Sequence, residues 1–321
     1  MFEIGALCRA FLLYASTPEV NGLESFMELL DSRRDPSKRT RGLITVSNHI
    51  SVPLSAFFTL GQVLPTHRLA HSSYGGVAQP TVTQAIRLLS KGPFPPDPHA
   101  AAEDRQRWSL QNVCVDPFSD LPTAYHTMGE DSYLAPSAYA CNSYSWIHIF
   151  PEGKVHQAPH KTMRYFKWGV ARLILESSEC PDVVPIWLEG TDQVMPESRK
   201  FPRFLPRPFK NISVTFGQRA DSETIFGDLR RRWQKLKEKS VKANSGQEPP
   251  LGVLTDDLLH GNEAVELRKE CTKRVRDLVL EVRRSRNLPD EDPKESLVET
   301  WIREGPKREG KMKDDSWVRD V

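Results

Sequence analysis

The stretch Trp146–Lys154, with the sequence WIHIFPEGK, decides the class of fold. Its first five residues, Trp146–Phe150, are a short apolar run closed by turn residues, and this pattern predicts a buried strand. Pro151 and Gly153 predict a tight turn. Glu152 then follows the C-terminal end of a strand, where open α/β sheets bind ligands, and Gly153 lets the backbone approach a ligand closely. An ordinary turn between a strand and a loop is the alternative interpretation.

A second strand is predicted at Gly42–His49, GLITVSNH, and it also ends in polar residues. Two such strands can place their polar ends at one edge of a sheet. Further strands are predicted at 182–190 and 212–216, and helices at 21–30, 81–90, 163–176 and 263–284. We therefore expect an α/β fold, with a mixed sheet flanked by helices.

The two strand ends together resemble a known family. Asn48-His49 after one apolar strand and Phe150–Gly153 after a later one are similar to the glycerolipid acyltransferase superfamily. Three further blocks, at 58–68, 163–169 and 184–195, are similar to the mitochondrial phospholipid transacylases of that superfamily. The resemblance covers residues 42–218 apart from one insert. It implies a glycerol-3-phosphate acyltransferase-like fold, a mixed sheet flanked by helices.

The resemblance also implies which residues form the site. It assigns His49 as the catalytic base. It assigns substrate binding to Gly61, Arg68, Phe150, Pro151, Glu152, Gly153, Glu189 and Gly190. Arg68 offers a guanidinium that suits a phosphodiester, although a surface arginine is the alternative. The resemblance implies no cofactor. The histidine pairs His67/His71 and His156/His160 lie beside proline or glycine, which do not fit a helix, so no metal site is expected there.

The chemistry of acyl transfer explains why a histidine is needed. The acceptor hydroxyl of a lysophospholipid is a poor nucleophile until a base removes its proton, and a neutral imidazole does this near pH 7. A carboxylate on the other ring nitrogen fixes the tautomer, and its loss cost about 10⁴ in turnover in the serine proteases. In the superfamily an aspartate lies five positions after the histidine, but this chain has Leu54 there.

No Asp or Glu occurs anywhere from His49 to Arg68, and these two residues are only 19 positions apart (68 minus 49). An internal loss after Val52 is our hypothesis for both features. Three interpretations follow. The chain is a coenzyme A-independent phospholipid–lysophospholipid transacylase that acts in cardiolipin remodelling, a non-catalytic lipid-binding remnant, or a coenzyme A-dependent lysophospholipid acyltransferase.

Composition limits the partners. With 321 residues, 38% of them hydrophobic, the chain can bury a sizeable core. A net charge of +2 favours no nucleic acid. The five cysteines are scattered and predict neither a disulfide framework nor a zinc site. No apolar run reaches the roughly 18 residues of a membrane span. The expected partners are phospholipids and lysophospholipids (cardiolipin, phosphatidylcholine) and a mitochondrial membrane surface, inner or outer, on which the protein lies peripherally.

Four regions are expected along the chain. Residues 1–41 form a helical or interfacial segment, and 42–220 form the acyltransferase domain with a disordered insert at 91–144. Residues 221–286 form a basic and amphipathic helical extension, and 287–321 form a disordered tail. In the extension, seven Lys and Arg residues between 230 and 242 surround Trp233, which predicts either a lipid-surface anchor or a solvated helix.

Overall fold

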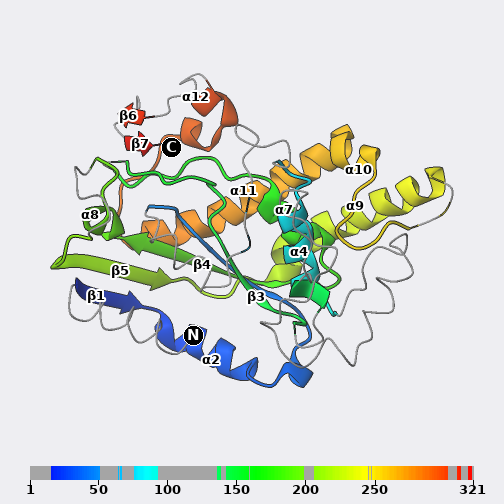
Figure 1. The fold of residues 1–321 in the computed structure, drawn as a ribbon, viewed down its shortest axis with the longest axis horizontal. Helices are drawn as coiled ribbons and strands as arrows, with labels where there is room; N and C mark the ends of the chain where they lie inside the picture. The colour runs from blue at the N-terminus through cyan, green and yellow to red at the C-terminus, as the bar shows by residue number, and fades with distance from the viewer. Residues whose placement is uncertain are drawn as a thin grey trace, which may run out of the picture.

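The computed structural model describes residues 16–50, 64, 66, 76–92, 136–138, 142–158, 160–198, 206–244, 246, 248–302, 309–311 and 317–319. The predicted α/β class is confirmed. A five-stranded mixed sheet has the order β1-β5-β4-β2-β3 (Figure 1). Its strands are β1 (Ser16–Asn21), β2 (Leu43–Ser47), β3 (Trp146–Ile149), β4 (Asp182–Glu189) and β5 (Lys210–Phe216).

Strand directions place the ends of three strands together. β2 pairs in parallel with both β3 and β4, whereas β4 and β5 are antiparallel and β1 is parallel to β5. Because β2, β3 and β4 run in the same direction, the residues that follow them lie at one edge of the sheet. The predicted strand ends at His49, Glu152 and Glu189 are therefore on the same edge.

The prediction that 146–150 is a buried strand is half wrong. The strand forms, but it is the edge strand next to β2, so only one side of it has a neighbour. Its residues alternate between exposed and half-buried, and the side chain of Trp146 is 50% exposed. By contrast, β2 lies between two strands and all five of its residues are buried.

Helices cover both faces of the sheet. On one face, Phe26 of α2 (Leu23–Ser32) packs against Leu43 and Val184. On the other face, Ile44 and Val183 belong to the main core, because successive strand residues point to opposite sides. The helices of that core are α4 (Pro80–Leu88), α7 (Gly169–Glu176), α9 (Ser222–Ala243), α10 (Asp256–His260) and α11 (Asn262–Ser285) (Figure 1).

Shorter elements complete the described chain. They are η1 (Pro36–Lys38), η2 (Pro136–Ala138), α8 (Thr191–Val194), η3 (Pro293–Ser296), α12 (Val298–Ile302) and the antiparallel pair of strands β6 (Glu309–Lys311) and β7 (Trp317–Arg319). None of the helices in the described ranges is both long enough and apolar enough to cross a membrane.

The helices of the predicted extension 221–286 pack into the main core. Phe226 and Leu229 of α9 and Val275 of α11 are fully buried beside the sheet residues of that core. Trp233 is only 2% exposed and lies under the guanidinium of Arg268, at 5.9 Å from the ring centroid. The prediction that Trp233 is an exposed aromatic anchor is therefore wrong, because its ring is buried in the core.

The predicted helix 163–176 begins only at Gly169. The main-chain amides before it have other acceptors. Met163 N donates to Glu291 Oε1 at 2.5 Å, Arg164 N to Glu152 Oε2 at 2.9 Å, and Lys167 N to Pro151 O at 2.8 Å. These bonds hold the segment extended, because the amides are directed to the side rather than along a helix axis.

The expected disorder of 287–321 does not hold for its first part. The side chain of Glu291 is only 4% exposed, and its carboxylate pairs with Arg276 at 2.6 Å and Arg283 at 3.5 Å, both on α11. Residues 289–291 are therefore held against α11. Most of the insert 91–144 lies outside the described residues, as do Leu54, Gly61 and Arg68.

Candidate active site

Asn48 directly follows β2, and its side chain extends the pairing of that strand with β4. Its Nδ2 donates to the carbonyl of Leu188 at 3.0 Å, and its Oδ1 accepts from the amide of Leu188 at 2.8 Å. The side chain is 1% exposed. An amide side chain supplies both a donor and an acceptor in this arrangement. The Asn48 side chain therefore bonds Leu188 as the backbone of a neighbouring strand would.

His49 is held at its backbone and at its ring. Its amide donates to Glu152 Oε1 at 2.7 Å, and its carbonyl accepts from the amide of His156 at 2.7 Å. The imidazole stacks on Phe150, with 4.7 Å between ring centroids and an interplanar angle of 24°. The turn after β3 therefore fixes the position of the imidazole at the end of β2.

Glu152 joins three segments of the site. Both of its oxygens accept main-chain hydrogen bonds, one from His49 and one from Arg164. The side chain is 2% exposed, and burial raises the pKa of Glu152 to about 7, against the opposing effects of these amides and of Arg276 and Arg164. In this geometry Glu152 positions the histidine.

The neighbours of Glu152 shape the turn. Gly153 has a φ of +69°, and a Cβ there would lie 2.7 Å from the Lys167 side chain, so glycine suits this position. The carbonyl of Pro151 accepts a hydrogen bond from the amide of Lys167. The residues predicted as one block, Phe150 to Gly153, are thus brought together beside His49.

Glu189 is the last residue of β4, and Gly190 follows it on the same edge. Glu189 pairs with Lys161 at 2.8 Å and with Arg286 at 3.0 Å, and Arg286 also pairs with Glu19 at 3.0 Å. Gly190 has a φ of +83°, and a Cβ there would lie 1.9 Å from the carbonyl oxygen of Asn211. Both residues line an open cavity of about 410 Å³.

His148 lies beside the site, although the sequence did not identify it as a site residue. Its Nδ1 lies 2.8 Å from the Thr45 hydroxyl and its Nε2 lies 3.2 Å from the Ser47 hydroxyl, so both nitrogens face β2 while the outer side of the ring is exposed. Desolvation on the inner side lowers the pKa of His148 to about 4. The ring meets Phe150 edge-on at 4.6 Å. Side chains alternate between the two faces of a strand, so His148 lies on the same face as Trp146, and this alternation was the signal that could have identified it.

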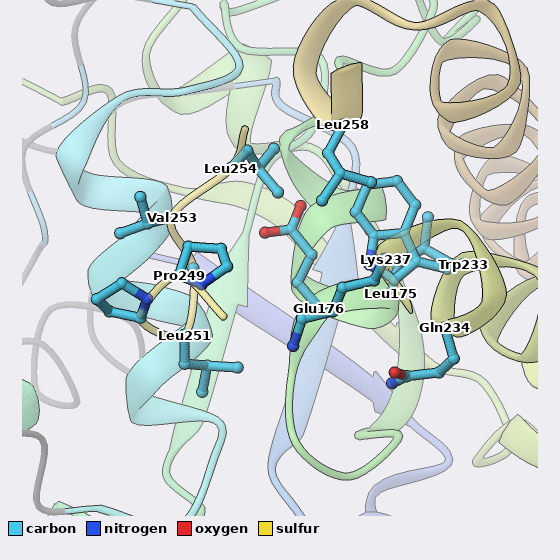
Figure 2. Close-up of a pocket in the computed structure, with 12 residues that line it drawn as sticks. Leu175, Glu176, Trp233, Gln234, Lys237, Pro249, Leu251, Val253, Leu254 and Leu258 are labelled. Atoms are coloured by element: carbon cyan, nitrogen blue, oxygen red, sulfur yellow. The ribbon is translucent and has the colours of Figure 1, made fainter. Parts of the chain in front are cut away.

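A second, smaller cavity lies away from this edge, among α7, α9 and the segment before α10. Figure 2 shows Glu176, Trp233 and Leu258 around it. Its volume is about 30 Å³, which is the space of one water molecule. The Glu176 carboxylate is bound to Arg172 by two hydrogen bonds of 2.6 Å. This cavity is too small to hold a phospholipid.

The described residues contain no group of three His, Cys, Asp or Glu side chains that could hold a metal ion. The mixed sheet, with a histidine after its parallel strand β2 and a buried glutamate after β3, defines an acyltransferase-like α/β domain. No family model matches this chain. Tafazzin from Saccharomyces cerevisiae is 30% identical to it, over 89% of this chain and 77% of the yeast protein. The chain therefore belongs to the tafazzin family.

Shorter matches agree with this assignment. Tafazzin from Drosophila melanogaster is 39% identical over 27% of the chain and 22% of the fly protein. N-acylphosphatidylethanolamine synthase from Arabidopsis thaliana is 42% identical over 23% of the chain and 26% of the plant protein. By family, this chain is a phospholipid acyltransferase.

Proposed function

We propose that this protein transfers acyl groups from phospholipids to lysophospholipids without free coenzyme A, and that it acts in cardiolipin remodelling in mitochondria. The observation that supports this most is the similarity to yeast tafazzin over 89% of the chain. Cardiolipin and phosphatidylcholine are the proposed substrates. Because acyl chains are insoluble in water, we place the protein peripherally on a membrane surface.

We propose His49 as the general base. Its imidazole removes the proton of the lysophospholipid hydroxyl, and the resulting oxygen attacks the ester carbonyl of the donor lipid. When the tetrahedral intermediate collapses, the leaving alcohol of the donor takes that proton back from the imidazolium. The stacking of the imidazole on Phe150 and the bond from the His49 amide to Glu152 support this role, because they fix where the base lies.

We propose substrate contacts for the other site residues. Arg68 and Gly61 hold the phosphate of the glycerolipid, as the resemblance implies. Phe150 offers the only ring stacked on His49 among the described residues, so it can bound the acyl ester. Glu152 acts through His49 rather than on the lipid. Glu189 and Gly190 form a wall of the neighbouring cavity.

Leu54 in the place of the usual aspartate lowers the expected rate. Loss of the corresponding carboxylate in serine proteases cost about 10⁴ in turnover. The alignment with yeast tafazzin is 329 positions long, which exceeds the 321 residues of this chain, so some aligned positions have no counterpart here. Transcript sequencing across Val52 tests the hypothesis of an internal loss directly. A transcript without missing bases would reject the hypothesis.

The test of function is acyl transfer from radiolabelled cardiolipin to lysophosphatidylcholine in liposomes. We expect slow transfer that His49→Ala abolishes and that Leu54→Asp accelerates. Transfer that depends on added acyl-coenzyme A would instead favour a coenzyme A-dependent acyltransferase.

A non-catalytic lipid-binding protein is the second candidate, and Leu54 is the observation that favours it. Liposome binding without transfer in the unmodified chain, in His49→Ala and in Leu54→Asp would support this candidate and reject ours.

A further inference from the structure

A groove with basic walls lies on the edge of the sheet opposite to His49. It measures about 460 Å³ and lies between the α2–β2 connection and the β5–α9 connection. Residues 33–42 lead into β2, whereas His49 follows its C-terminal end. The five residues of β2 separate the two places by about 16 Å, at about 3.3 Å for each residue.

The groove, which we call the basic groove, has more positive than negative charge. Its charged lining residues are Arg33, Lys38, Arg39, Arg41, Arg219, Asp182 and Asp221. Five cations against two carboxylates leave a net charge of +3. Two chain segments far apart in the sequence supply these cations, so the tertiary structure creates the cluster.

Both carboxylates of the basic groove are already engaged, Asp182 with two of the groove's own arginines and Asp221 with the start of α9. The carboxylate oxygens of Asp182 lie 3.7 Å from the Arg33 guanidinium and 3.7 Å from the Arg219 guanidinium. These distances are too long for hydrogen bonds, so the carboxylate lies between the two guanidinium groups without a close bond to either. Asp221 caps α9 by accepting from the amide and the hydroxyl of Thr224. Neither carboxylate therefore fully neutralises the cations around it.

The arginines retain donors for a ligand. Arg39 uses Nε to bond the carbonyl of Arg33 at 2.7 Å, but its terminal nitrogens make no hydrogen bond to any described residue. The side chain of Arg41 makes none within the described ranges either. Burial lowers the pKa of Arg33, Asp182 opposes this effect, and the charge of Arg39 adds to it. The crowded cations would thus be stabilised by an anion.

We propose that the basic groove binds a phosphate group, either on a lipid headgroup or as free inorganic phosphate. Guanidinium groups bind phosphate oxygens through paired hydrogen bonds, and Arg39, Arg41 and Arg219 converge on the groove from two segments. Ser222, the first residue of the 22-residue helix α9, also lines it, so the positive end of that helix adds to the field. The proposal does not depend on transacylation.

The test uses the full chain and two matched double variants. Arg41→Gln with Arg219→Gln removes two charges from the basic groove. Arg232→Gln with Lys235→Gln removes two charges from the exposed side of α9. Binding is measured by co-sedimentation with phosphatidylcholine vesicles, with and without phosphatidylglycerol. The melting temperature is measured in inorganic phosphate and in chloride at equal ionic strength.

We expect the groove variant to lose about thirtyfold in affinity for anionic vesicles, since each of the two cations near such a surface contributes about 1 kcal/mol, which is about fivefold. We expect the loss in affinity of the α9 variant to be at least ten times smaller than that of the groove variant. Vesicle binding that inorganic phosphate does not compete away would identify the headgroup as the ligand. Stabilisation by phosphate alone would identify the free ion.

Equal losses in both variants would overturn the proposal, because they would show a general electrostatic attraction. Absence of binding to either probe by the unmodified chain would overturn it as well. Transfer of detergent-dispersed substrate should be equal in the groove variant and the unmodified chain, so failure of this proposal is distinguishable from failure of the proposed activity.

Discussion

Replacement of Glu152 by glutamine tests the geometry on which the site depends. In the native chain the carboxylate accepts from the amides of His49 at 2.7 Å and of Arg164 at 2.9 Å. Glutamine retains one acceptor oxygen, but it turns an NH₂ group toward the second amide. A buried amide left without an acceptor costs about 1–3 kcal/mol. At pH 5, below its folded-state pKa of about 7, Glu152 is protonated, but its hydroxyl oxygen still accepts a hydrogen bond whereas the glutamine NH₂ group does not. The variant should therefore be less stable by this amount at pH 5.

The same substitution has a pH signature. The folded-state pKa of Glu152 is about 7, above its ordinary value of 4.5. The folded state therefore binds the proton more tightly, so the contribution of Glu152 to stability is fully present below pH 4.5 and is lost as the pH rises through 7. Between pH 5 and pH 8 this loss amounts to about 2 kcal/mol. Glutamine does not titrate, so the stability gap between the two proteins should narrow by that amount.

Urea unfolding at pH 5, 6, 7 and 8 measures both effects. Glu238→Gln, on the exposed side of α9, is the matched control and should change stability by less than about 0.5 kcal/mol at every pH. Parallel pH profiles for the native chain and Glu152→Gln would refute our reasoning that burial controls the ionisation of Glu152. Acyl transfer should also fall in this variant, because His49 loses an anchor.

Three further predictions concern the same edge of the sheet. Asn48→Ala should cost about 2–4 kcal/mol and speed hydrogen exchange at the Leu188 amide, because it leaves two main-chain groups of β4 without partners; unchanged exchange would contradict this. Gly190→Ala should destabilise the chain by clearly more than Gly246→Ala, for which we expect about 1–2 kcal/mol. Both glycines have a positive φ, but only at Gly190 would the added Cβ lie 1.9 Å from a carbonyl oxygen. Equal unfolding free energies for the two variants would refute the clash. The ring protons of His148 should titrate by NMR with a midpoint near pH 4, so its contribution to stability is present above pH 6.5 and is lost as the pH falls through 4; a midpoint near 6.5 would show that the ring is fully solvated.

The local pattern of the sequence determined much of the fold. The apolar runs before Asn48 and before Glu189 form β2 and β4, and the repeat of apolar residues at helical spacing in 263–284 forms α11. These elements could be predicted because each depends on its own residues. The turn Pro151–Gly153 was likewise set by proline and glycine, whose backbone preferences are intrinsic.

The tertiary structure alone decided how these elements are placed. Ser16–Asn21 forms β1 only because β5 offers it a parallel partner, and 146–149 is exposed because it received the edge position. Residues 163–167 are extended because two distant carboxylates, Glu152 and Glu291, accept their amides. Sequence similarity pointed to Glu152, but its role as an anchor of His49 depends on hydrogen bonds between residues 103 positions apart, and no local pattern encodes such a distance.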